Sequence, residues 1–168
     1  MKMVIGLGNI GKEYERNRHN AGFIMVDKYA EELGLAWKNE KKFNANVARG
    51  SDVILVKPLT LMNRSGSAVS SAVSFYKVEP ADVYVIHDDV DLEFGKVKVQ
   101  RGGGSAGHHG IEDVIEKLGT QEFWRVRIGV GRPIDIRFEV TDWVLSDFSD
   151  EELHTVVTEV DIASLLEK

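Results

Sequence analysis

The chain has 168 residues, enough for one domain with a single core, and its lack of cysteine excludes thiol nucleophiles, iron–sulfur clusters and disulfide scaffolds. The net charge of −6 weighs against nucleic acid as a partner, but nine acidic side chains and only one lysine lie in residues 139–168. Residues 1–138 hold 18 acidic and 20 basic side chains, so the acidity belongs to the tail.

Hydrophobic periodicity divides the first half of the chain into a buried strand, a helix, a hairpin-like strand pair and a second helix. These elements are expected at residues 3–7, 21–33, 44–49 with 52–57, and 69–76. Gly34 supplies the stop of the first helix, and Gly50 with Ser51 joins the two hairpin strands. The stretch before the first helix, residues 12–20, is polar and without a pattern.

The second half of the chain alternates strands and helices. A continuous apolar strand, an alternating strand with a basic face, a glycine-rich loop, a short helix and another strand are expected at residues 83–86, 96–101, 102–107, 111–118 and 124–130. Ser149 and Glu152 form a capping box before an amphipathic C-terminal helix. The order predicts an α/β fold, with one domain over residues 1–168 and a twisted mixed sheet flanked by helices on both faces.

A glycine motif in the first loop suggests dinucleotide binding, but its context does not fit. Gly6, Gly8 and Gly11 match the spacing of that motif directly after a strand. The expected helix starts about nine residues too late to place its N-terminus at a pyrophosphate. The required acidic residue after a second strand is also missing, because that region is helical. We therefore disfavour a dinucleotide site.

Five histidines are the other candidates for chemistry. His87, three nearby aspartates and the pair His108 and His109 offer ligands suited to a metal, but no established ligand spacing supports one. His108 opens a helix, where it is expected to cap or contact backbone, and His154 is expected to be exposed. His19 lies in a loop, where catalytic groups collect. Its natural partner as a general base is Asp88, at a strand end.

Two loop amides and two basic runs complete the set of candidates. Asn9 and Asn63 are suited to orient a carbonyl and to stabilise a developing oxyanion. The basic runs are interleaved with apolar residues and consist of Lys96, Lys98 and Arg101, and of Arg125, Arg127, Arg132 and Arg137. Such spacing can line one face with charge, although scattered surface cations are the plainer interpretation. Together with His19 and Asp88, the amides have the parts for water-mediated ester hydrolysis.

Five blocks of sequence resemble, in order, the signature segments of bacterial peptidyl-tRNA hydrolases. They are GLGNIGKEYERNRHNAGF (6–23), KPLTLMNRSG (57–66), HDDVDLEFGKVKV (87–99), GGGSAGHHG (102–110) and RVRIGVGRP (125–133). The resemblance implies hydrolysis of the ester between peptide and tRNA, which recycles stalled peptidyl-tRNA in translation. It also implies that neither a metal nor an organic cofactor takes part.

The resemblance further implies a role for each matching residue. His19 corresponds to the base that activates water, Asp88 to the acid that holds this histidine, and Asn9 to the residue that distinguishes a peptidyl from an aminoacyl group. Positions that contact the tRNA 3′ end and the peptide correspond to Tyr14, Leu61 and Asn63. Regions that grip the phosphates of the acceptor arm correspond to Lys98, Arg101 and Arg127. Phosphate contacts position an ester without reading sequence.

The chain departs from the family pattern at two positions and in its tail. Ile10 stands where the family usually has proline, a change in loop stiffness. His109 replaces an asparagine that helps to hold substrate and water; a histidine is larger and can titrate near neutral pH, so affinity or pH dependence is expected to differ. The match beyond Pro133 is loose, which leaves the contacts of that part open.

The sequence thus favours an enzyme, with one alternative from another class. The same scaffold could serve a non-catalytic RNA-binding protein similar to organellar splicing factors, and release of free tRNA would distinguish the two. The N-terminal apolar run is too short for a signal peptide, and no stretch approaches membrane-spanning length. We expect a cytoplasmic monomer without membrane contact or an obligate protein partner.

Overall fold

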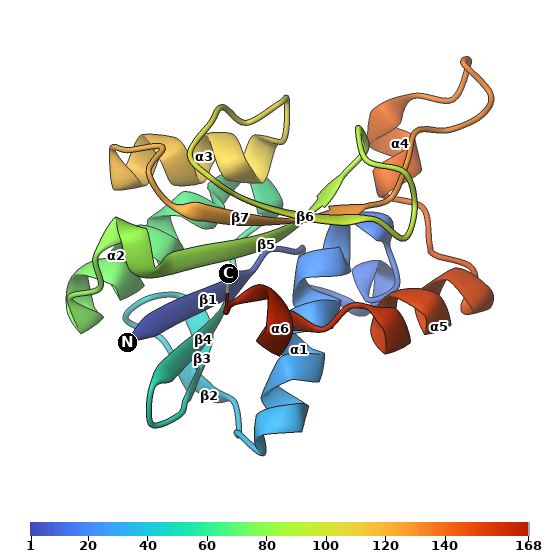
Figure 1. Cartoon of the computed structure of the whole chain (residues 1–168). Helices are drawn as coiled ribbons and strands as arrows, with labels where there is room; N and C mark the ends of the chain where they lie inside the picture. Colours follow the sequence, from blue (N-terminus) through green and yellow to red (C-terminus); the bar gives the residue numbers. More distant parts are fainter. Residues whose placement is uncertain (168) are drawn as a thin grey trace.

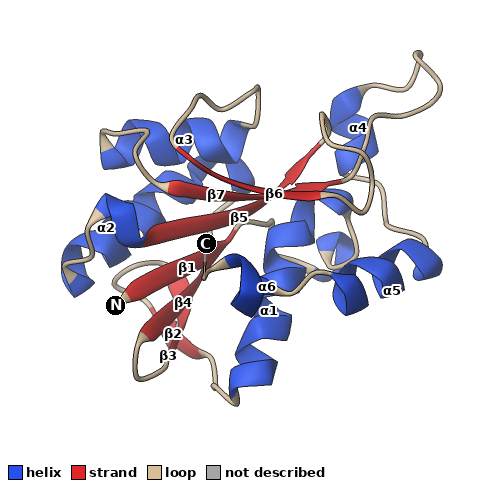
Figure 2. Cartoon of the chain, viewed as in Figure 1, coloured by secondary structure: helices blue, strands red, loops and turns tan. Residues whose placement is uncertain are grey.

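A computed structural model describes residues 1–167 and builds them, within that range, around one seven-stranded sheet (Figure 1; Figure 2). The strands are β1 (Lys2–Gly6), β2 (Lys38–Glu40), β3 (Ala45–Arg49), β4 (Val53–Pro58), β5 (Val83–Asp89), β6 (Val97–Arg101) and β7 (Trp124–Gly129). The α-helices are α1 (Ala21–Leu33), α2 (Ser65–Tyr76), α3 (His109–Leu118), α4 (Val140–Val144), α5 (Asp150–Glu159) and α6 (Ile162–Leu165). Short 3₁₀ turns are η1 (Lys12–Tyr14), η2 (Arg18–Asn20), η3 (Met62–Arg64) and η4 (Pro80–Asp82).

The sheet is mixed, as the sequence predicts. Its strand order is β2-β3-β4-β1-β5-β7-β6. The central strands β4, β1, β5 and β7 run parallel, whereas β2 and β3 at one edge and β6 at the other pair antiparallel to their neighbours. Parallel strands bring their carboxyl ends to one edge of the sheet, which is where α/β folds bind ligands.

Helices cover both faces of the sheet. Figure 1 shows α2 and α3 on one face, with α1 and α6 on the other. Each face has its own core: one is built from β-sheet residues with α1 and the C-terminal helices, the other from sheet residues with α2 and α3. The strand β5 runs between the two cores and is buried along its whole length. This position accounts for its continuous apolar sequence.

Two glycines bring the start of α1 against the central strands. A Cβ on Gly6 would lie 2.2 Å from the backbone oxygen of Gly22, and a Cβ on Gly22 would lie 2.3 Å from the backbone oxygen of Ile86. Only glycine permits so close an approach of two backbones. The contact places η2, and with it His19, beside the end of β5.

The local elements agree well with the sequence predictions. The helix α1 has the predicted bounds and ends at Gly34, whose φ of 68° is the left-handed conformation that a glycine cap provides. The predicted hairpin is the pair β3 and β4. Ser149 and Glu152 form the predicted capping box, since each side chain accepts a hydrogen bond from the other residue's backbone N–H. The expected exposure of His154 is also confirmed.

Some short elements lack a sequence signal. The strand β2 has three exposed or half-buried polar residues and is held by its pairing with β3. The helix α4 is only five residues long, too short for hydrophobic periodicity to show. No helix among residues 1–167 combines the length and the apolar character needed to cross a membrane.

Candidate active site

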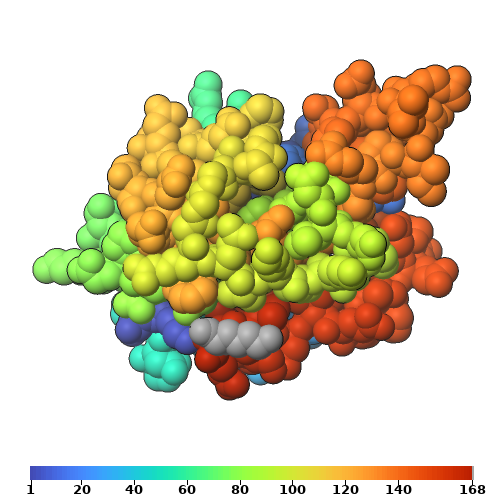
Figure 3. Space-filling view, turned by 45° about the horizontal axis from the view of Figure 1, so that its top comes forward, coloured from blue at the N-terminus to red at the C-terminus, as the bar shows by residue number. Residues whose placement is uncertain are grey.

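A pocket of about 550 Å³ opens at the carboxyl ends of β1 and β5. Its walls come from the loop after β1, from η2 and η3, from the end of β5, from the loop before α3, and from α4. In the space-filling view the segment around α4 (orange) stands apart from the α3 segment (yellow), with a hollow between them (Figure 3). Segments far apart in the sequence therefore meet around one open cavity.

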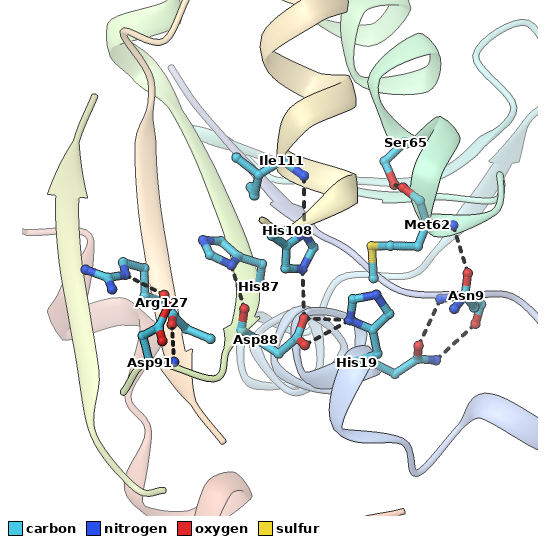
Figure 4. Close-up of polar contacts among 12 residues, drawn as sticks. Asn9, His19, Met62, Ser65, His87, Asp88, Asp91, His108, Ile111 and Arg127 are labelled. Carbon is cyan, nitrogen blue, oxygen red and sulfur yellow. Dashed lines mark hydrogen bonds and ion pairs between the residues drawn. The ribbon is translucent and has the colours of Figure 1, made fainter. Parts of the chain in front are cut away.

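Asp88 lies at the centre of a hydrogen-bonded cluster in this pocket (Figure 4). The side chain is only 2% exposed and accepts from two histidines. His19 Nδ1 lies 2.8 Å from Oδ2 and 3.0 Å from Oδ1, and His108 Nε2 lies 2.9 Å from Oδ1. The strand β5 thus supplies the carboxylate, η2 supplies one imidazole, and the residue before α3 supplies the other.

The hydrogen bonds fix which nitrogen of each ring carries a proton. His108 Nδ1 accepts from the backbone N–H of Ile111 at 3.2 Å, so the proton of this ring lies on Nε2 and is donated to Asp88. His19 donates from Nδ1 to Asp88, which leaves Nε2 of His19 with a free lone pair. A neutral imidazole with this orientation is ready to accept a proton.

The same three side chains form the one group within residues 1–167 that has metal-ligand spacing, with ligand atoms within 4.8 Å of one another. Their hydrogen bonds do not suit a metal ion. A metal on Nε2 of His108 would require the proton to move to Nδ1, where it would oppose the N–H of Ile111. The cluster fits proton transfer better than metal binding.

Burial and charge set the protonation of the pair. Burial lowers the pKa of His19, but the charge of Asp88 and the hydrogen bond to it raise the pKa more, so that it lies above its ordinary value of 6.5. Burial opposes ionisation of Asp88, yet the two histidines hold the pKa of this carboxyl far below its usual range. The carboxylate is therefore ionised and favours a proton on His19.

A third histidine on the pocket wall has a different character. His87 is 5% exposed and donates from Nδ1 to the backbone oxygen of Asp88 at 2.8 Å. Burial, with a further contribution from His108, lowers the pKa of His87 to about 3. It is therefore a much weaker proton acceptor than His19.

The side-chain amide of Asn9 is fixed on the side of His19 that lies away from Asp88 (Figure 4). Asn9 Oδ1 accepts from the backbone N–H of Met62 at 2.8 Å, and the side chain of Asn20 bonds to both backbone groups of Asn9. This orientation leaves Nδ2 of Asn9, which has no partner within residues 1–167, as the end available to a bound molecule.

Similarity to known proteins shows which family the chain belongs to. The family model described as "Peptidyl-tRNA hydrolase" matches residues 3–166. The chain belongs to the peptidyl-tRNA hydrolase family. A peptidyl-tRNA hydrolase of Mycoplasma capricolum is 47% identical over 158 residues, covering 92% of this chain and 84% of the relative. One of Neisseria meningitidis is 48% identical over 155 residues, covering 90% and 80%. The crystal structure of the Acinetobacter baumannii peptidyl-tRNA hydrolase superposes with a TM-score of 0.87 at 36% identity, covering 93% of this chain and 81% of that one.

Most of the residues that the family resemblance selects line the pocket. Besides His19, Asp88 and Asn9, the walls include Tyr14, Leu61, Asn63 and His109. The side chain of His109 is 76% exposed and its Nδ1 lies 3.4 Å from Glu112, so this departure from the family pattern sits at the rim.

The three predicted phosphate-binding residues lie apart from this pocket, on β6 and β7. Lys98 is exposed and pairs in register with Arg127. Arg127 Nε lies 2.7 Å from Asp89 Oδ2, and Nη1 lies 2.8 Å from Gln100. Arg101 is exposed at the end of β6, with Glu122 at 3.8 Å. Arg127 and Asp89 line a smaller chamber of about 210 Å³ that shares part of its wall with the main pocket.

One member of the basic runs does not contribute to a charged surface. Arg125 is 2% exposed and donates to the backbone oxygens of Gly103, Gly104 and Gln121. Its guanidinium also lies 4.3 Å from the centre of the Phe123 ring. Because Arg125 faces inward, it holds the glycine-rich loop in place and does not form part of a phosphate-binding face.

Sequence reasoning missed two residues of the site. It considered His108 as a metal ligand and expected it to cap or contact backbone, and although the residue does cap α3, its other nitrogen bonds Asp88. The signal was present, since His108 precedes a residue selected by the resemblance and follows the glycine-rich loop. Met62, which fixes the amide of Asn9 through its backbone, gives no such signal, because a backbone N–H is common to nearly all residues.

Proposed function

We propose that the chain hydrolyses the ester of peptidyl-tRNA with His19 as general base and Asp88 as its partner. The hydrolysis itself follows from membership of the peptidyl-tRNA hydrolase family. The observation that supports these roles is the 2.8 Å contact between His19 Nδ1 and Asp88 in an open pocket. It leaves Nε2 of His19 free to take a proton from water.

The proposed reaction has two steps. As water attacks the ester carbonyl, its proton passes to Nε2 of His19, and the charge of Asp88 stabilises the imidazolium. The tetrahedral intermediate then collapses, and His19 returns the proton to the departing 3′-ribose oxygen of the tRNA. Nδ2 of Asn9 and the amide of Asn63 are assigned to hold the carbonyl oxygen and the peptide.

The tRNA is assigned to the edge formed by β6 and β7. Lys98, Arg101 and Arg127 all belong to this edge. Leu61 and Tyr14 in the main pocket are assigned to the 3′ end and the adjoining peptide. We also propose a cytoplasmic monomer, folded as one domain and without an obligate protein partner, because the substrate is a product of cytoplasmic translation.

The test is to incubate purified protein with a peptidyl-tRNA and to follow the release of free tRNA. We expect wild-type protein to release tRNA and His19→Ala to lose about 10²- to 10⁴-fold in turnover. Affinity of the variant for tRNA should stay near that of wild type, because the imidazole acts on the reacting atoms.

Two results would contradict the proposal. Binding of peptidyl-tRNA without release at any protein concentration would favour the non-catalytic RNA-binding alternative. A His19→Ala variant that keeps more than about a tenth of wild-type turnover would remove His19 from the role of base.

A further inference from the structure

Next to His19, the side chain of Arg18 points away from the pocket into the C-terminal segment. It is 7% exposed, although arginine is rarely buried without partners. Nη1 donates to Ser146 Oγ at 2.6 Å and to the backbone oxygen of Asp147 at 3.0 Å, and Nη2 lies 3.1 Å from Glu152. The backbone N–H of Arg18 also donates to the backbone oxygen of Ser146 at 3.1 Å.

The guanidinium also stacks on α4. Its carbon atom lies 3.6 Å from the centre of the Trp143 ring, a close cation–π contact. Trp143 Nε1 in turn donates to the backbone oxygen of Gly131 at 2.9 Å, where the chain leaves β7. One buried side chain thus connects η2 to both ends of the segment that carries α4.

The same α4 forms a wall of the pocket. Val140, Val144 and Leu145 line the cavity on one side of the helix, whereas Trp143 meets Arg18 on another. Because Arg18 and His19 are consecutive in one 3₁₀ turn, the Arg18 contacts connect α4 to the turn that carries the imidazole. A stacked guanidinium that donates from two nitrogens to different acceptors is well suited to such a role.

We infer that Arg18 is a positioning residue for ester hydrolysis, which holds the α4 wall and His19 in one fixed arrangement around the bound ester. The inference rests on the proposed role of His19. The family model matches the chain through residue 166, and the inference makes its C-terminal segment a working part of the active site, through Trp143 and Glu152.

Replacement of Arg18 by methionine, which keeps the aliphatic bulk, should separate α4 from His19. Misplacement of a catalytic group by about 1 Å costs on the order of 10²-fold, so we expect kcat/KM to fall about 10- to 100-fold. Arg18→Lys should recover only part of the loss, because a single ammonium nitrogen cannot stack on Trp143 and reach the acceptors of both Nη1 and Nη2 in the same way. Arg16→Met is the matched control, since the exposed Arg16 pairs with Asp150 of the same segment, and within residues 1–167 no hydrogen bond or cation–π contact joins it to Trp143.

Two readouts separate positioning from a loss of folded protein, and both are measured below the unfolding transition of every variant. The first is the pH profile of kcat/KM. If α4 is released, water reaches His19, burial lowers its pKa less, and the acid limb moves to higher pH while Asp88 and His108 are unchanged. The second is a double-mutant cycle with Trp143→Leu, in which the double variant should be little worse than either single one.

The inference is overturned if Arg18→Met keeps wild-type kcat/KM and pH profile, if Arg16→Met loses as much activity, or if the losses of Arg18→Met and Trp143→Leu multiply. His19→Ala, assayed in parallel, keeps the two proposals apart. If His19→Ala is inactive and Arg18→Met has wild-type activity, only the positioning role is contradicted. If His19→Ala is active, the proposed function itself is contradicted.

Discussion

Two consecutive carboxylates at the end of β5 serve two different regions of the molecule. Asp88 is 2% exposed and Asp89 is 7% exposed, yet they have no side-chain partner in common. Successive side chains of a strand point to opposite faces of its sheet. Asp88 therefore meets two imidazoles, whereas Asp89 meets the guanidinium of Arg127 at 2.7 Å.

The difference lies in what each partner can do with a proton. An imidazole exchanges its proton near neutral pH, so the carboxylate beside His19 controls acid–base chemistry. A guanidinium keeps its charge at all such pH values, so the carboxylate beside Arg127 controls only where a positive charge is held. Under the proposed function, one strand thus separates the region assigned to bond breaking from the region assigned to phosphate binding.

Neutralising each carboxylate in turn should have the largest effect on activity. Asp88→Asn should lower kcat by roughly 10²-fold or more, because the imidazolium loses its stabilising charge. The Asp88 charge raises the His19 pKa and burial lowers it, so in this variant the pKa falls and the acid limb of the pH profile moves to lower pH. Wild type should lose activity as the pH falls through the raised pKa, above 6.5. Both profiles come from initial rates of tRNA release.

Asp89→Asn is the matched variant on the neighbouring position. It should raise KM while kcat stays within about threefold of wild type, because Arg127 is displaced but the base is intact. Equal losses of kcat in the two variants, or an acid limb that moves in both, would show that the two regions are not separate.

The position of the proposed catalytic pair could be predicted from sequence to a large extent. Asp88 lies at the end of an apolar strand, and His19 precedes a strongly periodic helix, so both fall at the edge of the sheet where ligands bind. Local patterns could not show that His108 bonds Asp88, since the capping role already explains a polar residue at that position. Nor could they show that Arg125 is buried, because its hydrogen bonds go to backbone oxygens of a loop.

The pocket wall formed by α4, and the way residues 146–148 attach it to the rest of the fold, were the least predictable part. Residues 16–18 pair with residues 146–148 through backbone hydrogen bonds and an isolated bridge between Asn17 and Asp147. Such pairing joins segments about 130 residues apart and leaves no periodicity in either of them. The predicted capping box accounts for Glu152 at the start of α5, but it could not show that Glu152 also bonds a buried arginine.

A smaller effect should come from the cations of the binding region. Lys98→Ala and Arg127→Gln should each raise KM about 3- to 10-fold without changing kcat, because a phosphate contact is equally strong in the ground and transition states. The logarithm of tRNA affinity falls linearly with the logarithm of salt concentration, and the slope of this line should become shallower by about one for each phosphate contact removed. Titrations at several salt concentrations measure this slope. An unchanged slope in both variants would place the acceptor arm elsewhere on the molecule.

The smallest effect is expected at the rim, where His109 belongs to neither region. Its side chain is 76% exposed and its one polar contact, to Glu112, is long at 3.4 Å. An exposed interaction of this kind is worth less than about 1 kcal/mol, so His109→Asn should change KM by only about two- to threefold. We expect KM to fall, because the smaller amide offers a donor and an acceptor without charge, and kcat to stay constant, because Asp88 and His19 are untouched. Steady-state kinetics measure both constants. A large change in kcat would mean that His109 reaches the reacting ester and belongs to the catalytic region.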